Sequence, residues 1–405
     1  MSEPKSTAAS PERLHGLDAL RAVMMLLGLL LHTLVSYGPH RPLGDTWPYL
    51  DEKTSVLSDL IVVYIHSFRM PLFFVMSGFF AAMLFERRGA ASMLRNRFAR
   101  IGIPFVVGMI VIYPMARSGF VFAPVAASAS VASGLSTVRE QMTAAPYENF
   151  NTIHLWFLYY LLYFYVMGLG CQRVAEMLPE RFRAEGRRRF EALLRSPWRP
   201  LVLAVPSAVT LLPMTTPSFD TSVSLVPDAK TFAAYFIFFG FGWLLYGSRS
   251  LLETFVDRAW TLCILGSALF VPNFLAQRAI WAGSEHGAIA RLVSSATGGL
   301  MAWLLIFGTT GLFLRYASKA STKMRYMVDA SYWLYLLHLP IAIWVPGLIS
   351  QWSVPALVKI VVVLAVMVPT LVVTYHLFVR PTIIGKVLNG RRYPAPIPFF
   401  GRGGS

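Results

Sequence analysis

Long apolar segments separated by short polar ones run through almost the whole chain. Many of them approach the roughly 20 residues that a helix needs to cross the hydrocarbon core of a bilayer. Ten such segments can be delimited, at residues 16–37, 56–85, 101–116, 154–178, 199–214, 230–247, 259–276, 288–314, 331–350 and 354–378. The pattern predicts an all-α polytopic membrane protein with about ten transmembrane helices.

Composition supports this prediction, because 56% of the 405 residues are hydrophobic and only 14% are charged, against about 25% in a typical soluble domain. Most Lys and Arg residues lie in polar segments that fall on one side of the predicted membrane, namely 86–100, 173–199, 315–328 and 379–405. The positive-inside rule places this side, and both chain termini, in the cytoplasm. The same distribution accounts for the net charge of +16, so no nucleic-acid partner is predicted.

The chain is expected to contain one main domain with short flanking parts. We predict a cytoplasmic N-terminal segment at 1–15, a transmembrane domain at 16–380 and a flexible cytoplasmic tail at 381–405, whose end is rich in Pro and Gly. Two connecting segments are long. The outer one, 117–153, is nearly uncharged and is expected to be a loop, and the inner one, 179–198, is basic. We expect the basic segment to be partly helical and to lie against anionic lipid headgroups.

The first apolar segment carries two polar residues that a membrane span would normally exclude, Arg21 and His32. Eleven residues at 100° each amount to about 20° more than three full turns, so both side chains lie on one helix face, about 16 Å apart along the axis. Ionisable groups inside a membrane are costly and therefore indicate a functional site. Alternatively, Arg21 could reach the inner headgroups and His32 could hydrogen-bond a neighbouring helix.

The second segment repeats this combination in "HSFRMP", where His66 and Arg69 are three residues apart, just before Pro71. A helical proline removes one backbone hydrogen bond, so we expect a kink or break there. Arg69 should face a cavity or a partner, or else satisfy the carbonyls that the kink frees. Ser77 follows about two turns further along.

Three later segments add polar candidates. Arg97 and Arg100 precede the third span, and paired guanidiniums suit phosphate groups, although ordinary positive-inside charge would explain them too. His154 opens the fourth span beside an aromatic belt that could be simple interfacial anchoring. In the ninth span, Tyr335 and His338 extend a polar stripe that could be a site or a packed, hydrogen-bonded face.

No metal-ligand motif occurs, so no metal site is predicted. The two cysteines lie in apolar segments and form no ligand set. Lys359 is expected to be an interfacial residue near the end of its span.

Several motifs together resemble the acyltransferase-3 family of integral membrane O-acyltransferases. The similar stretches are "LDALRA" with Asp18, Arg21 and His32; Arg97 to Arg100; "FFVMSGFF" at 73–80; and "SYWLYLLH" at 331–338. Within the family, "HSFRMPLFFVMSGFF" and "HLWFLYYLL" look most like the branch that succinylates osmoregulated periplasmic glucans.

The resemblance implies that an acyl group moves from cytoplasmic acyl-CoA, with succinyl-CoA favoured, to hydroxyls of a periplasmic glucan across the bacterial inner membrane. Arg21, Arg97 and Arg100 would hold the donor phosphates. His32 would carry the chemistry, either as general base or as acyl carrier. His66 or Arg69 would add positive charge near the developing oxyanion. The remaining predicted polar residues of the cavity are Asp18, Ser77, His154, Tyr335 and His338.

Other functions remain open at this stage. The chain could be an acetyltransferase of the same family that acts on another extracytoplasmic glycan, or a transporter or flippase without covalent chemistry. A homo-oligomer is possible. A succinyl donor would need a cation for its free carboxylate, for which Arg69 and Arg291 are the candidates. Asp18 is about 21 Å from His32 along the helix, too far to orient its ring.

Overall fold

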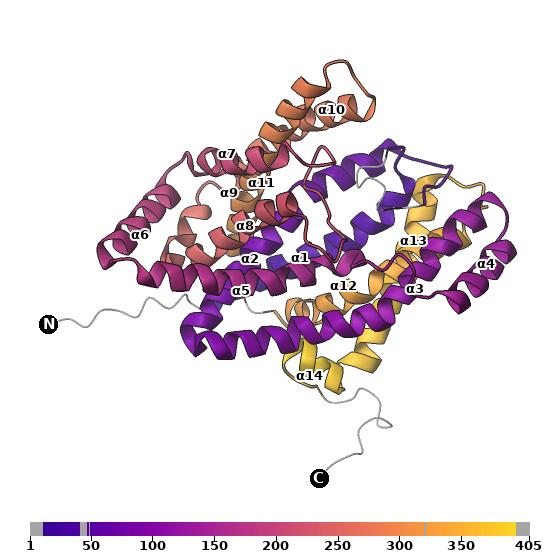
Figure 1. Ribbon diagram of the computed structural model, residues 1–405, viewed down its shortest axis with the longest axis horizontal. Helices are drawn as coiled ribbons and strands as arrows, with labels where there is room; N and C mark the ends of the chain where they lie inside the picture. Colours follow the sequence, from indigo (N-terminus) through magenta and orange to yellow (C-terminus); the bar gives the residue numbers. More distant parts are fainter. Residues whose placement is uncertain (1–10, 41–46, 48, 320, 394–405) are drawn as a thin grey trace, which may run out of the picture.

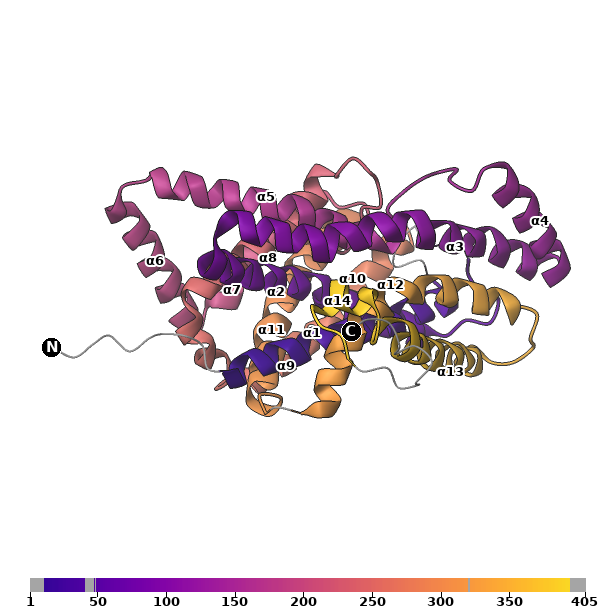
Figure 2. The ribbon, with the colours of Figure 1, turned by 90° about the horizontal axis from the view of Figure 1, so that it is seen from below.

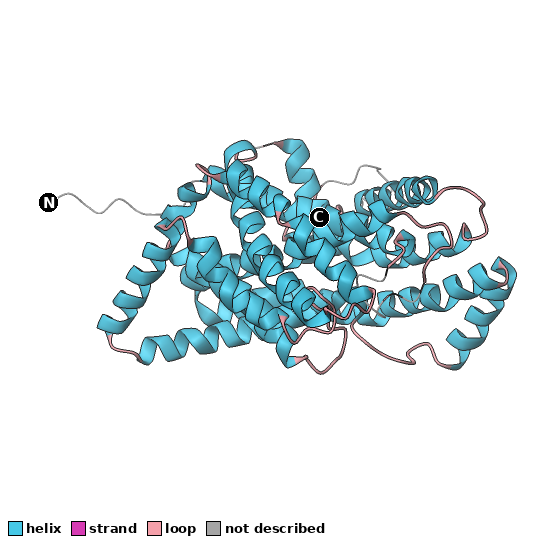
Figure 3. Cartoon of the chain, turned by 90° about the horizontal axis from the view of Figure 1, so that it is seen from above, coloured by secondary structure: helices cyan, strands magenta, loops and turns pink. Residues whose placement is uncertain are grey.

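The computed structural model describes residues 11–40, 47, 49–319 and 321–393. These residues form helices joined by loops, with no strand among them (Figure 3). The α-helices are α1 Pro11–Leu34, α2 Val56–Arg97, α3 Ile103–Ser128, α4 Val131–Ala144, α5 Trp156–Met177, α6 Glu180–Arg195, α7 Arg199–Leu211, α8 Ala229–Gly247, α9 Ala259–Ala268, α10 Phe270–Trp281, α11 Gly287–Tyr316, α12 Thr322–Leu348, α13 Ala356–Thr374 and α14 Ile383–Asn389. Short 3-10 helices occur at Val35–Tyr37, Ile153–Leu155 and Arg249–Phe255, and π-helices at Phe98–Gly102 (η3) and Tyr375–Val379.

Eight helical stretches of the described chain are long and apolar enough to cross a bilayer. One of them, Val56–Ser128, is 73 residues long and contains both the second and the third predicted span. The fifth predicted span corresponds to the shorter apolar helix Arg199–Leu211. The prediction of an all-α polytopic membrane protein is therefore confirmed.

Helix α2 does not break where the sequence suggested. Pro71 lies inside the helix with helical backbone angles, and the non-helical residue of α2 is Gly89, with φ 74° and ψ 170°. Of the kink or break expected at Pro71, the break is therefore wrong. Glycine adopts positive φ without the clash that a Cβ atom causes, so Gly89 is where the long stretch can change direction.

The closest helix pairing depends on two glycines in α2 and α8. A Cβ atom on Gly78 would lie 2.0 Å from the carbonyl oxygen of Phe239, and one on Gly242 would lie 1.9 Å from that of Val75. Small residues of this kind let membrane helices approach backbone to backbone. Gly78 of the "FFVMSGFF" motif therefore serves helix packing, and this contact holds α2 in place beside the cavity described below.

The segment predicted as the outer loop, 117–153, is mostly helical. Helix α3 continues to Ser128, and α4 folds back against it at one end of the molecule (Figure 2). Gly134 of α4 sits on the ring of Phe122, where a Cβ atom would be 2.9 Å away. The prediction that this segment is a loop is therefore wrong.

The basic segment 179–198 forms helix α6, as expected, and lies at the opposite end of the molecule from α4 (Figure 1). The apolar residues of its second half face the protein, since Leu194 is buried and the Phe190 ring lies 5.7 Å from that of Phe241, whereas Phe182 near its start is exposed. The arginines remain exposed, and two of them, Arg188 and Arg189, pair with Glu185.

The tail predicted as flexible begins with ordered structure. Helix α14 occupies Ile383–Asn389, and Arg391 and Tyr393 both hydrogen-bond the carboxylate of Asp329 in α12, at 2.8 and 2.7 Å. Residues 394–405 lie outside the described residues.

Lys359 of α13 is not interfacial, which corrects the sequence prediction. It is 1% exposed, as is its partner Asp51 in the loop after α1, and its ammonium group lies 2.8 Å from the carboxylate. The same ammonium group also donates to the carbonyl of Ser350 at 2.9 Å. The pair ties α13 to the loop that carries Trp47, a residue of the candidate site.

Replacing Lys359 with methionine is expected to lower the free energy of unfolding by roughly 3–5 kcal/mol, because Asp51 would keep a buried charge without its cation. Thermal and denaturant unfolding of the detergent-solubilised protein would measure this change. The exposed Lys386 provides the control, since Lys386→Met should change stability by at most about 0.5 kcal/mol. Equal stability of the two variants would contradict the assigned role of the ion pair.

Candidate active site

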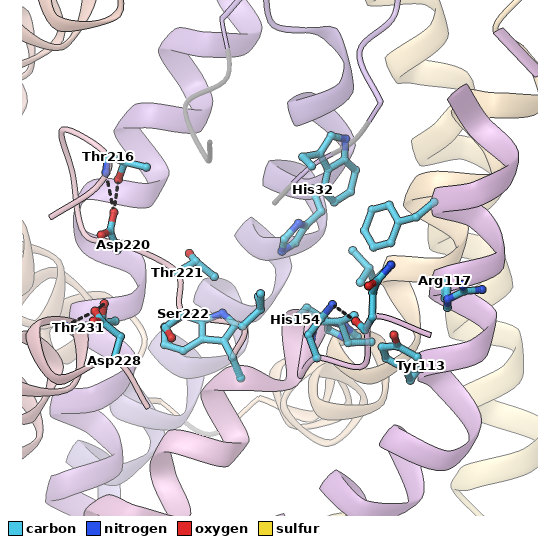
Figure 4. A pocket seen from close by; sticks show the side chains of 18 of the residues that line it. His32, Tyr113, Arg117, His154, Thr216, Asp220, Thr221, Ser222, Asp228 and Thr231 are labelled. Atoms are coloured by element: carbon cyan, nitrogen blue, oxygen red, sulfur yellow. Dashed lines mark hydrogen bonds between the residues drawn. The ribbon is translucent and has the colours of Figure 1, made fainter. Parts of the chain in front are cut away.

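A cavity of about 1210 Å³ lies at the His32 end of α1 and is lined by side chains from helices α1, α2, α3 and α8 and from the loops before α5 and α8. We call this the cavity end. Figure 4 shows His32 pointing into the space between two groups of polar side chains. One group contains Tyr113, Arg117 and His154, and the other contains Thr216, Asp220, Thr221, Ser222, Asp228 and Thr231.

His32 comes from the last turns of α1 and is half-buried at the inner part of this cavity. Its ring stacks on the indole of Trp47, with centroids 5.6 Å apart, and lies 5.0 Å from the ring of His338. The indole is held by a 2.9 Å hydrogen bond from its nitrogen to Ser36. His32 Nδ1 is buried and has no hydrogen-bond partner among the described residues. Ring contacts therefore position the imidazole, and its Nδ1 atom is left without a hydrogen-bond partner among the described residues.

Three further histidines surround His32, and each donates one ring N–H to a backbone carbonyl. A carbonyl can only accept, so the other nitrogen of each neutral ring must be an acceptor. The bonds are His66 Nε2 to Phe219 at 2.7 Å, His154 Nε2 to Leu336 at 3.0 Å and His338 Nδ1 to Tyr335 at 2.6 Å. Within the described part of the chain, His32 is the one histidine of the four that no such bond restrains, and it is therefore the best placed to exchange protons.

Helix α12 brings the predicted polar stripe to the site. Tyr335 donates its hydroxyl hydrogen to the carbonyl of His154 at 2.8 Å, and the His154 and His338 rings lie 5.0 Å apart. His154, which sequence reasoning could not separate from interfacial anchoring, is buried against α12 and lines the cavity. Through these contacts, Tyr335 and His338 link His154, which lies just before α5, to His32.

Arg69 reaches the same place from α2. It is 7% exposed, its Nε has no hydrogen-bond partner, and its Nη2 donates to the sulfur of Met70 at 3.2 Å. Gly28, one turn before His32 on α1, makes room for it, since a Cβ atom there would lie 2.1 Å from Nη1 of Arg69. Arg69 also lines a second cavity of about 20 Å³ with His32 and Met25. The guanidinium and the imidazole therefore lie over neighbouring turns of one helix face.

The other predicted arginines gather at the opposite end of α1, which we call the arginine end. Arg100 is close enough to Arg21, Arg88 and Arg97 to interact with them electrostatically. Asp18 pairs with Arg21 at 3.1 Å, and in the described chain neither Arg97 nor Arg100 forms an ion pair. The hydroxyl of Tyr332 holds the backbone carbonyl of Arg100 at 2.9 Å. The result is a strongly cationic cluster in which Arg88 is an addition that the motifs did not indicate.

Three of the residues predicted to line the cavity, Asp18, Ser77 and His338, are not among those that line either cavity around His32, although His338 contacts the His32 ring. Asp18 belongs to the arginine end through its pair with Arg21. Ser77 is half-buried in α2 and is not among the residues that line either cavity around His32.

Several cavity residues were missed by sequence reasoning because they come from loops without a recognisable motif. Trp47 follows α1, and Glu148 and Asp220 come from the connections before α5 and α8. Glu148 pairs with Arg117 at 2.6 Å, and Asp220 accepts hydrogen bonds from the backbone of Thr215 and Thr216. Of these residues, only Trp47 had a signal in the sequence, because it is an aromatic residue close to the first span, which carries Arg21 and His32.

The cavity offers aromatic rings beside hydroxyl, amide and carboxylate groups. This combination can hold a polyhydroxylated ligand by ring contact and by paired hydrogen bonds. In the described chain, no group of three or more His, Cys, Asp or Glu side chains is arranged to bind a metal ion.

Comparison with known proteins identifies the family of this chain. A family model described as an acyltransferase domain matches residues 14–379. Glucans biosynthesis protein C of Escherichia coli (strain K12) is 27% identical over 363 residues, which cover 84% of this chain and 86% of that protein. Glucans biosynthesis protein C of Salmonella schwarzengrund (strain CVM19633) is 24% identical over 387 residues, which cover 93% and 94%. No solved structure matches the chain. Since the family model covers most of the sequence, the resemblance suggested by the motifs is confirmed, and the chain belongs to the acyltransferase-3 family.

Proposed function

We propose that this protein is a membrane O-acyltransferase of the bacterial inner membrane that moves a succinyl group from cytoplasmic acyl-CoA to hydroxyls of a periplasmic glucan. One observation carries the proposal. His32 lies in the large cavity on the same continuous helix, and on the same helix face, as Arg21 of the cationic cluster. The two ends of this helix could therefore serve two substrates from opposite sides of a membrane.

The donor would bind at the arginine end. Coenzyme A carries several phosphate charges, and guanidinium groups pair with phosphate oxygens through two parallel hydrogen bonds. Arg97 and Arg100 have no carboxylate partner in the described chain, so their N–H groups are available for this purpose. The extended pantetheine arm has a reach comparable to the rise of about 16 Å between Arg21 and His32, so the thioester could arrive beside the imidazole.

His32 would act on the acceptor hydroxyl. As the hydroxyl oxygen attacks the thioester carbonyl carbon, His32 takes the hydroxyl proton. The tetrahedral intermediate then expels the thiolate of coenzyme A, which receives that proton from the imidazolium, leaving an ester and a free thiol. In the alternative route, His32 first accepts the acyl group and then passes it to the hydroxyl. His66, which was expected to add positive charge near the oxyanion, donates its Nε2 hydrogen to the carbonyl of Phe219. Arg69 keeps an Nε–H without a partner among the described residues and is available to an anionic group of the donor.

The acceptor would enter from the cavity end. Oligosaccharides bind where aromatic rings contact the sugar faces and polar groups pair with the hydroxyls. Both kinds of group line the cavity, with Trp47 beside His32 and with Asp220 and Ser222 opposite. The relatives named for glucan biosynthesis make a glucan the first acceptor to test.

The test is thiol release by the purified protein reconstituted in lipid vesicles. Succinyl-CoA and acetyl-CoA would each be supplied with and without a periplasmic-type β-glucan, followed by detection of the acylated glycan. Glucan-dependent thiol release with succinyl-CoA is the expected result. Preference for acetyl-CoA would instead support a same-family acetyltransferase, and binding of donor without any release would support a carrier.

A further inference from the structure

Arg69 is a buried cation whose charge no carboxylate in the described chain balances. Three positively charged side chains from arginine or lysine line the large cavity. Arg117 pairs with Glu148 at 2.6 Å, and Lys230 lies 3.6 Å from Asp220. Among the described residues, Arg69 hydrogen-bonds only the Met70 sulfur and contacts the ring of Phe73, 5.9 Å away. It is also the one of the three that additionally lines the small cavity beside His32.

A buried guanidinium without an anion is costly. The desolvation of an ion in a protein interior is offset only when an opposite charge and hydrogen bonds replace the lost water. Arg69 Nε has no hydrogen-bond partner among the described residues, and the contact of Nη2 with the Met70 sulfur is weak. Most of the desolvation cost of this guanidinium is therefore not offset. An anionic ligand in the cavity would offset it.

Position limits what this ligand can be. Arg69 Nη1 sits over Gly28, one turn from His32, and both side chains line the small cavity on the side toward Met25. Met25 lies about two turns from His32 in the direction of the arginine end, from which the donor would come. A carboxylate bound to Arg69 is therefore within a few bonds of a carbonyl carbon held at His32. The carboxylate of a four-carbon diacid is three C–C bonds, of about 1.5 Å each, from its thioester carbon.

We propose that Arg69 binds the free carboxylate of the acyl group, so that this site selects a dicarboxylic acyl donor over a monocarboxylic one. The proposal rests on the proposed acyltransferase function. Arg291, the other sequence candidate, donates to the carbonyl of Met214 and is not among the residues that line either cavity. Arg69 thus acts on the far end of the acyl group, and its fork of N–H groups matches a carboxylate.

The test compares succinyl-CoA with butyryl-CoA, which has the same chain length but a methyl group in place of the carboxylate. The measured quantity is the ratio of kcat/KM for the two donors, with one acceptor held at saturation. Wild-type protein should prefer succinyl-CoA, and Arg69→Gln should lower this ratio about 10- to 100-fold, as expected for one charge-assisted hydrogen-bonded pair. Arg69→Lys keeps the charge without the fork and should give an intermediate ratio.

Two further variants separate binding from structure. Gly28→Ala would push the guanidinium aside without removing its charge, and it should lower the ratio in the same direction. Arg117→Gln removes a cavity arginine that already has a partner, and it should leave the ratio unchanged whatever its effect on the absolute rates. Gel filtration and thermal unfolding would verify that each variant folds. If Arg69→Gln does not fold, Arg69→Lys and Gly28→Ala still measure the ratio.

Equal losses with both donors would overturn the proposal, because they would assign Arg69 to the thioester oxygen or to the fold. So would an unchanged ratio in Arg69→Gln. Failure of the proposed function looks different, since wild-type protein would then transfer neither acyl group to any acceptor.

Discussion

Replacing His32 with alanine is expected to reduce acyl transfer by about 10²–10⁴-fold, the usual contribution of a general base, and to abolish it altogether if His32 carries the acyl group. The fold should be retained. His32 makes no hydrogen bond to another described residue, so its removal leaves no donor or acceptor without a partner. Thiol release and glycan acylation by the reconstituted protein would measure the loss, with thermal unfolding as the check on folding.

The matched control is His286→Ala, which removes an exposed histidine between α10 and α11 that lies outside both cavities. It should have near wild-type activity. Activity close to that of the wild-type protein in His32→Ala would remove this residue from the mechanism, since both the base and the acyl-carrier route depend on the imidazole. Single-turnover experiments with labelled donor would separate the two routes, because only the carrier leaves label on the protein when the acceptor is omitted.

Replacing both Arg97 and Arg100 with alanine is expected to weaken coenzyme A binding by roughly 10²-fold or more. Each hydrogen bond to a charged group contributes about 1.5–3 kcal/mol, and the two side chains are only half-buried, so solvent reduces the upper end of that range. The contact that holds Arg100 in place would survive, because Tyr332 binds its backbone carbonyl and not its side chain. The KM for the acceptor should change little, since both arginines are at the other end of α1 from the cavity.

Calorimetric titration of coenzyme A into the detergent-solubilised protein would test this expectation. The control is the double variant Arg188→Ala with Arg189→Ala, which removes the same charge from the exposed face of α6. A larger loss of coenzyme A affinity in the Arg97/Arg100 variant than in the control would identify a specific site. Equal losses would mean that only the general positive charge attracts the donor. The wild-type affinity should also fall steeply with added salt.

Local pattern was enough to predict the class of fold and part of the site. Apolar length depends only on neighbouring residues, and it indicated the membrane spans without any knowledge of their packing. Helical periodicity is equally local, so the alignment of Arg21 with His32 on one face of α1 followed directly from their spacing. Motif resemblance singled out Arg97 and Arg100 as donor-binding residues, and the structure places Arg100 within electrostatic reach of Arg97 and of Arg21 in α1.

Other expectations failed where the outcome depended on contacts between elements. Lys359 was expected to be an interfacial residue near the end of its span, but it is buried against Asp51, which lies 308 residues away in the sequence. A kink or break in α2 was expected at Pro71, yet that turn keeps helical backbone angles and the chain departs from helix at Gly89. In both cases a local preference was overridden by packing that the sequence does not display.

The sequence by itself determined that this is an α-helical membrane protein of the acyltransferase-3 type, with basic residues at one end and a histidine within its first helix. These features follow from hydropathy, periodicity and motif order, all of which act over a few residues. The tertiary structure decided which groups meet His32. Trp47, His338 and Arg69 come from three separate elements, and no spacing rule relates them to α1. Their arrangement depends on how the helices pack, because the free energy of packing is shared among residues that are distant along the chain.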